Sequence, residues 1–261
     1  MEQPLFRHYV SKGSRYNQIY LPKEMNQYFN VGDMVEVRLV EKGNRVYQSE
    51  MVGEISEFKK KLIKEIFKII SNRKEVEQIF IFGSFLTKKE GYNDIDILIL
   101  TKEKDEGIEE EIYKQLTEEF NLKFHVISIE KSKLEDILEV DPMTRSMFSR
   151  YVSDKEFKMS KKTKRDRNHL LFLMMMPEDI LKFKMNREVY YDNLRKLITI
   201  ERFLDKKEID SVEIRADAER ILDKIGFNDF KGQSFVNEKE LKELKKLFEP
   251  ILKGAYKKIN E

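Results

Sequence analysis

Residues 79–100, which read IFIFGSFLTKKEGYNDIDILIL, constrain the fold of this chain more than any other segment. The segment begins as an apolar strand, turns at Gly83-Ser84, and resumes as a second apolar strand that carries Asp94 and Asp96. Side chains at positions i and i+2 of a strand point to the same face of a sheet. We therefore expect Asp94 and Asp96 to lie side by side on one surface, with the isoleucines beside them in the core.

Two adjacent carboxylates repel each other unless a cation lies between them. Oxygen ligands on a rigid strand suit Mg²⁺, which usually takes one or two carboxylates together with substrate phosphates. A glycine at position 83 lets the backbone approach a phosphate closely, and Ser84 adds a hydroxyl and an N–H donor at the start of a short helix. The sequence thus predicts a phosphate site (Gly83, Ser84) beside a metal site (Asp94, Asp96).

These four residues and their flanking strands resemble the signature of the nucleotidyltransferase superfamily that includes DNA polymerase beta. The likeness is greatest to its small prokaryotic members, the minimal nucleotidyltransferases. The resemblance implies an enzyme that moves a nucleoside monophosphate from a nucleoside triphosphate (NTP) to an acceptor hydroxyl, with Mg²⁺ or Mn²⁺ as cofactor. It implies that Asp94 and Asp96 hold the metal and are catalytic, and that Gly83 and Ser84 bind the nucleotide.

Active members of this superfamily usually carry a third metal-binding carboxylate on the next strand. In this chain that strand reads KFHVISI, and its candidate inward positions are Lys123 and His125, neither of which is acidic. His125 is a possible substitute, because the pKa of histidine lies near neutrality. Two hypotheses stay open: an enzyme with two carboxylates and another group, or a domain that binds nucleotide without chemistry.

Residues 12–40 carry a second resemblance, to the swapped-hairpin β-barrel of the SpoVT-AbrB family. The matching pieces are a strand that ends in Leu-Pro-Lys at residues 21–23, a Val-Gly-Asp turn at residues 31–33, and a strand with alternating valines at residues 35–39. The resemblance implies a homodimer formed by strand exchange and, in many members, DNA binding. The candidate DNA contacts are Lys12, Arg15, Lys23 and Arg38. However, residues 1–55 hold seven Lys/Arg and seven Asp/Glu, so this module is not strongly basic.

The remaining patterns predict an α+β protein of three parts: a small β-barrel-like module at residues 1–54, a nucleotidyltransferase sheet domain at residues 55–154 and a helical domain at residues 155–261. Amphipathic helices are expected at residues 56–75 and 108–120, with one face of the sheet covered by helices. From about residue 155 we expect helices throughout, including a buried run LLFLMMM and a last helical segment broken at Pro250.

Basic residues concentrate in the stretch 155–167, where Lys161, Lys162, Lys164 and Arg165 are candidate contacts for phosphate or nucleic acid. A solvated linker or helix face would show the same pattern. The acceptor could be a nucleic acid, a protein hydroxyl or a small molecule.

Composition excludes several classes of protein. Of the 261 residues none is Cys, so disulfides and thiolate metal sites are excluded, and the net charge of +2 gives no global attraction to nucleic acid. No apolar run approaches the roughly 20 residues of a membrane span. The first ten residues lack the layout of a signal peptide. We therefore expect a soluble cytoplasmic protein.

The main hypothesis is a Mg²⁺-dependent nucleotidyltransferase. The alternative hypothesis is a DNA-binding dimeric regulator whose nucleotidyltransferase-like domain only senses nucleotide. The N-terminal resemblance and the missing third carboxylate motivate this alternative.

Overall fold

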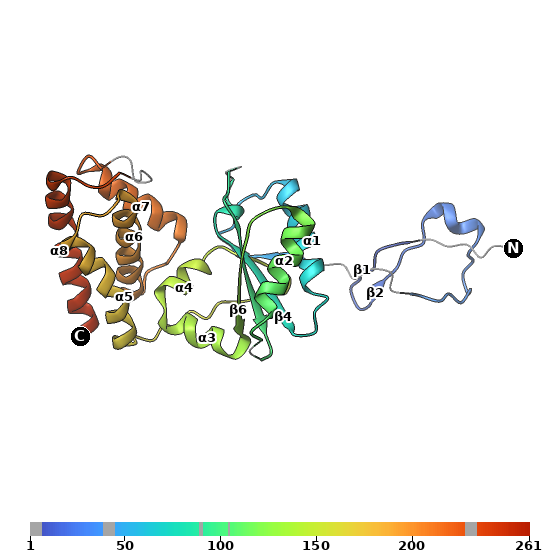
Figure 1. The fold of residues 1–261 in the computed structure, drawn as a ribbon. Helices are drawn as coiled ribbons and strands as arrows, with labels where there is room; N and C mark the ends of the chain where they lie inside the picture. The colour runs from blue at the N-terminus through green and yellow to red at the C-terminus, as the bar shows by residue number, and fades with distance from the viewer. Residues whose placement is uncertain (1–6, 39–44, 89–90, 104, 228–233) are drawn as a thin grey trace. The chain divides into compact units, whose positions relative to one another are not determined.

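The computed structural model describes residues 7–38, 45–88, 91–103, 105–227 and 234–261. It is a mixed α+β protein that divides into two compact units, residues 1–43 and residues 44–261 (Figure 1). Each unit is described by itself.

The described part of the N-terminal unit, residues 7–38, holds little regular structure. The strands β1 (Ser11–Lys12) and β2 (Asn17–Gln18) form a two-stranded antiparallel sheet, and the short 3-10 helix η1 spans Lys23–Gln27. None of residues 7–38 is buried. Since burial of apolar surface is the main driving force of folding, the described part of this unit lacks a core that would stabilise it by itself.

The expected β-barrel is not confirmed in this unit. The strand expected at residues 35–39 does not form within residues 35–38, and residue 39 lies outside the described residues. The β-rich run at residues 45–48 also predicts a strand, which forms as β3 (Tyr47–Gln48). This strand pairs with β7 (Val152–Ser153) in the sheet of the larger unit.

The five-stranded sheet of the larger unit has the order β3-β7-β4-β5-β6. Its long strands are β4 (Val76–Phe82), β5 (Ile95–Thr101) and β6 (Phe124–Glu130). The β4 strand runs antiparallel to β5, and β5 runs parallel to β6. A parallel pair needs a crossover, which the helix α2 (Ile108–Phe120) provides, as the sequence pattern predicts.

One face of the sheet packs against α1 (Glu57–Ile70) and α2 through the isoleucines of β4 and β5. Ser56 precedes the apolar periodicity of α1 and is of a residue type that caps helices. Its side chain accepts a hydrogen bond from the backbone N–H of Lys59, which confirms this N-cap. Helical periodicity predicts an apolar face made of Phe58, Leu62, Ile66, Phe67 and Ile70. The last four are buried, but Phe58 is 64% exposed.

The second face of the sheet is also covered, which corrects the expectation of a single covered face. Here α3 (Lys131–Val140) and α4 (Pro142–Met147) bring Leu134, Leu138 and Phe148 against the alternate side chains of β4 and β5. Phe80 of β4 packs edge-on against Phe148 at 5.1 Å between ring centroids. Because both faces are covered, β5 is apolar at nearly every position.

The helical part has its own core, built from four long helices. They are α5 (Arg167–Asp179), α6 (Arg187–Leu204), α7 (Ser211–Asp223) and α8 (Glu238–Asn260), with the short helix η3 (Ile180–Lys182) after α5. Two expectations are wrong here. Pro250 does not break α8, and only Leu170 and Met174 of the run 170–176 are fully buried. Leu171 and Leu173 are partly buried against this core, whereas helical periodicity turns Phe172, Met175 and Met176 toward the surface.

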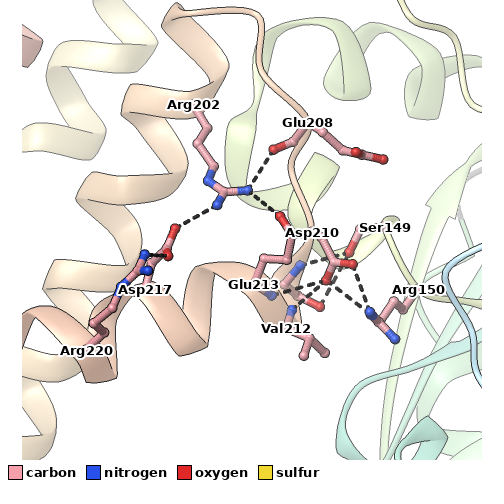
Figure 2. Close-up of polar contacts among 10 residues, drawn as sticks. Ser149, Arg150, Arg202, Glu208, Asp210, Val212, Glu213, Asp217 and Arg220 are labelled. Carbon is pink, nitrogen blue, oxygen red and sulfur yellow. Dashed lines mark hydrogen bonds and ion pairs between the residues drawn. The ribbon is translucent and has the colours of Figure 1, made fainter.

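An ion pair joins the segment after α4 to the start of α7 (Figure 2). Asp210, with its side chain 7% exposed, accepts hydrogen bonds from Arg150 Nε at 3.1 Å and Arg150 Nη2 at 2.8 Å. The same carboxylate caps α7 by accepting from the backbone N–H groups of Val212 and Glu213. Burial alone would raise the pKa of Asp210, but the bonds from Arg150 and Val212 together lower it.

None of the described helices combines the length and the apolar character needed to cross a membrane.

Substitution Asp210→Ala should lower the free energy of unfolding by about 3 kcal/mol, because it removes a helix cap and leaves Arg150 without its partner. Urea unfolding followed by circular dichroism would measure this. The lowered pKa implies that the difference is present above about pH 4 and shrinks as the pH falls through the folded pKa. Asp179→Ala, at an exposed pair with Lys182, is the control and should change little. Equal effects from the two variants would contradict the prediction.

Candidate active site

The turn after β4 has a backbone shape that favours glycine. Gly83 has φ 82° and ψ −160°, a combination that L side chains rarely adopt. The 3-10 helix η2 (Ser84–Leu86) follows at once, and Thr87 closes it by donating from its N–H and its hydroxyl to the Ser84 carbonyl. The Ser84 hydroxyl has no hydrogen-bond partner among the described residues, so it is available to a ligand.

Asp96 lies directly against Gly83. The β4–β5 register places Phe82 opposite Asp96, and a Cβ built on Gly83 would overlap Oδ2 of Asp96. Only a residue without a side chain leaves room for this carboxylate. The predicted phosphate turn and the predicted metal-binding strand are therefore in contact.

The two carboxylates lie at the beginning of β5. Asp94 immediately precedes the strand, and Asp96 lies within it on the face that Leu98 and Leu100 bury further along. The flanking Ile95 and Ile97 are buried on the opposite face, as the alternation predicts. Asp96 is thus held at the open end of an otherwise apolar strand.

The environment of Asp96 disfavours its charged form. Burial raises the pKa of Asp96, and the nearby Asp94 charge raises it further, while the hydrogen bond with His125 opposes both. A carboxyl whose pKa is raised in the folded protein binds protons more tightly there than in the unfolded chain. Its ionisation therefore costs folding free energy as the pH rises above its unfolded pKa of about 3.9. A cation would remove this cost.

His125 occupies the position beside Asp96 on the next strand. The parallel register pairs Asp96 with His125, and His125 Nδ1 lies 3.2 Å from Asp96 Oδ1. Lys123 precedes β6, and its carbonyl accepts a hydrogen bond from the Ile95 N–H. Glu130 lies at the other end of β6, opposite Thr101. Of the residues that the sequence offers on this strand, only His125 contacts the carboxylate pair.

The donor set suits a divalent cation in part. Asp94 and Asp96 offer oxygen ligands, and their mutual repulsion is the condition that a bound cation relieves. Within the described residues, no group of three or more His, Cys, Asp or Glu side chains is placed so that it could hold a metal ion. A cation at this site would take ligands from the substrate.

The basic stretch 155–167 is not helical before Arg167, which corrects the expectation of helices from residue 155. Arg145 binds this stretch to the sheet part by donating to the carbonyls of Ser160 and Lys162. Of the four candidate contacts, Arg165 donates instead to the carbonyls of Leu204 and Lys258, near the ends of α6 and α8.

The other three candidates, Lys161, Lys162 and Lys164, are exposed and make no ion pair within the described residues. They keep their charge available, whereas the guanidinium of Arg165 holds two helix ends.

A cleft of 270 Å³ adjoins the turn, and its residues were missed from the sequence. Its walls include Ser84, Tyr92 and Asn93 from the sheet part, and Tyr191, Arg195 and Arg215 from α6 and α7. The guanidinium of Arg195 lies over the Tyr191 ring, 5.5 Å from its centroid. No local sequence pattern marks these helical residues, because only tertiary packing brings them to the turn.

Comparison with known proteins agrees with this geometry. Residues 64–150 match the model of a family described as Polymerase beta, Nucleotidyltransferase. The match includes the turn, both carboxylates and His125, and it supports the nucleotidyltransferase superfamily and a general nucleotidyltransferase activity. Neither a curated protein nor a solved structure gave a match.

Gly83→Ala should lower the free energy of unfolding by at least about 2 kcal/mol, because the backbone is strained for alanine and the new Cβ overlaps Asp96. Thermal or urea unfolding would measure it. Gly53→Ala is the matched control, since a Cβ there meets nothing within 4 Å, and it should change stability by no more than about 0.5 kcal/mol. A Gly83→Ala variant as stable as the wild type would show that the contact does not constrain this turn.

Proposed function

We propose that the protein is a nucleotidyltransferase that moves a nucleoside monophosphate from an NTP to an acceptor hydroxyl and releases pyrophosphate. The observation that carries the proposal is the direct contact between the Gly83 turn and Asp96, within the region that matches the family model. A phosphate site and a carboxylate pair in contact are the two parts that this chemistry needs.

Each residue has a distinct role in the proposal. Gly83 allows a phosphate to approach the backbone, and the Ser84 hydroxyl donates a hydrogen bond to it. Asp94 and Asp96 would hold Mg²⁺ or Mn²⁺, which when bound supplies positive charge at the reacting phosphate. The sheet fixes these carboxylates before substrate arrives, because Asp96 is paired on both sides by backbone hydrogen bonds.

His125 is the proposed substitute for the third carboxylate. Its contact with Asp96 supports this role, in which the imidazole would take up the proton of the acceptor hydroxyl. Lys161, Lys162 and Lys164 are proposed contacts for phosphate or for a nucleic-acid acceptor, since their charges are unpaired within the described residues. Arg165 is a weaker proposal, because its side chain bonds to helix carbonyls.

Asp94→Asn and Asp96→Asn should each reduce transfer at least about a hundredfold, because the amide removes charge from the metal site. The assay incubates purified protein with each α-³²P-labelled NTP, Mg²⁺ or Mn²⁺, and cellular RNA or protein as acceptor. The raised pKa of Asp96 adds a second expectation: at neutral pH, metal-free Asp96→Asn should unfold at a higher urea concentration than the wild type.

Asp223→Asn, an exposed carboxylate at the end of α7, is the control and should keep full activity. Transfer that persists in either site variant would refute the assignment. A site variant that is inactive but less stable than the wild type would indicate a structural role for that carboxylate.

A second function is favoured by one specific observation, the lack of any buried residue in the described part of the N-terminal unit. We propose that a second copy of the chain covers its apolar side chains, which include Tyr16, Val31 and Met34. The resulting dimer would bind DNA through the exposed Lys12, Arg15, Lys23 and Arg38. In this alternative, the nucleotidyltransferase-like domain only senses nucleotide.

This alternative predicts a dimer in solution and DNA binding that weakens steeply with salt. Arg15→Gln and Arg38→Gln should each lower the slope of log K against log salt by about one, because each removes one phosphate contact. Fluorescence anisotropy with a labelled duplex measures the slope, and sedimentation measures the mass. Lys242→Gln, exposed on α8, is the control. Absence of binding at low salt, or binding indifferent to salt, would contradict the proposal.

A further inference from the structure

The cleft beside the turn is formed by two parts of the chain that no local pattern connects. Ser84 and Asn93 contribute from the sheet part, whereas Arg195 and Arg215 come from α6 and α7. Neither Asp94 nor Asp96 lines it. The cleft therefore adjoins the phosphate turn without including the carboxylate pair.

Two arginines in this cleft are incompletely satisfied by the protein. Arg215 is half-buried, and it makes no hydrogen bond or ion pair with any other described residue. Arg195 bonds to Asp192 at 3.1 Å, but its Nε is buried without a hydrogen-bond partner in the part of the chain that the structure describes. Buried donors are almost always paired in folded proteins, so the protein leaves part of the hydrogen-bonding capacity of these guanidinium groups unused.

The acidic residues of the cleft neutralise the charge of Arg195 but not that of Arg215. Asp192 is paired with Arg195, and its charge is thereby balanced. Glu188 is exposed at the cleft and has no ion-pair partner among the described residues. The cleft thus holds one unpaired cation, Arg215, and one unpaired anion, Glu188, on different helices of the described chain.

We propose that this cleft binds the terminal phosphates of the NTP, with Arg195 and Arg215 as the cationic contacts. The inference rests on the proposed function, because it takes the α-phosphate to lie at Asp94 and Asp96. From that point the phosphate chain passes Ser84 and enters the cleft, where planar guanidinium groups match phosphate oxygens.

The size of the cleft agrees with this assignment. Pockets that enclose a whole drug-sized ligand have volumes of roughly 300–1,000 Å³. At 270 Å³ the cleft lies below that range, so it suits one end of a nucleotide better than the complete molecule.

Binding of inorganic tripolyphosphate with Mg²⁺ tests the proposal without requiring any transfer reaction. Isothermal titration calorimetry would compare the full-length wild type with Arg215→Gln, Arg195→Gln and Glu188→Gln. Arg220→Gln is the matched control: it lies on α7 like Arg215, pairs with Asp217 and does not line the cleft. Arg215→Lys tests whether charge alone is sufficient.

The proposal expects tripolyphosphate to bind about tenfold more weakly to Arg215→Gln and Arg195→Gln, as loss of one charged hydrogen bond implies. Arg215→Lys should restore part of the affinity, and Arg220→Gln should have no effect. Glu188→Gln should strengthen binding, because it removes repulsion. The affinity for a nucleoside monophosphate should not change in the arginine variants, because this ligand has no terminal phosphates. A general structural defect would instead weaken the binding of both ligands.

Several results would overturn the proposal. One is unchanged tripolyphosphate affinity in both arginine variants, and another is no tripolyphosphate binding by the wild type. Weaker binding by Glu188→Gln would instead indicate a ribose or base that donates hydrogen bonds to this carboxylate. The proposed function would fail separately, if Asp94→Asn and Asp96→Asn kept their transfer activity while the cleft still bound tripolyphosphate.

Discussion

The close contact of Gly83 with Asp96 is the constraint on which the candidate site depends. Antiparallel pairing of β4 with β5 places Phe82 opposite Asp96, and the turn must then leave β4 past a carboxylate. A glycine allows this path of the backbone for two reasons: it has no Cβ that would overlap Asp96, and it adopts a positive φ without strain. The same geometry holds a backbone amide, a hydroxyl and a carboxylate at one sheet edge.

Because both faces of the sheet are buried, a charged side chain at this edge is partly removed from water. The two core clusters cover β5 from Ile97 onward, so Asp96 is the position at which apolar packing gives way to a charge. Its raised pKa is the energetic cost of that placement. Groups with such perturbed pKa values concentrate at functional sites, which is why this edge of the sheet is the candidate site.

The helical part completes the site through an anchored connection. Arg150 and Asp210 bond in a bidentate pair at the beginning of α7, and Arg165 bonds to carbonyls near the ends of α6 and α8. These charged contacts fix the two helices that carry Arg195 and Arg215 toward the Ser84 turn. The cleft therefore depends on the orientation of α6 and α7, which an alteration far from the chemistry can change.

Local pattern was sufficient for the turn, the carboxylate strand, α2 and the Ser56 cap, because strand alternation and helix capping are properties of neighbouring residues. Pattern failed where the outcome depends on distant partners. The strand β3 belongs to the large sheet rather than to the N-terminal module, because its hydrogen bonds are made with β7. Pro250 lies within a continuous α8, whose apolar face is packed in the helical core. The sequence by itself determined that a glycine turn and two carboxylates follow one another on neighbouring strands, because strand alternation is a local property, whereas tertiary packing decided that His125 meets Asp96 and that two helical arginines line a cleft with Ser84.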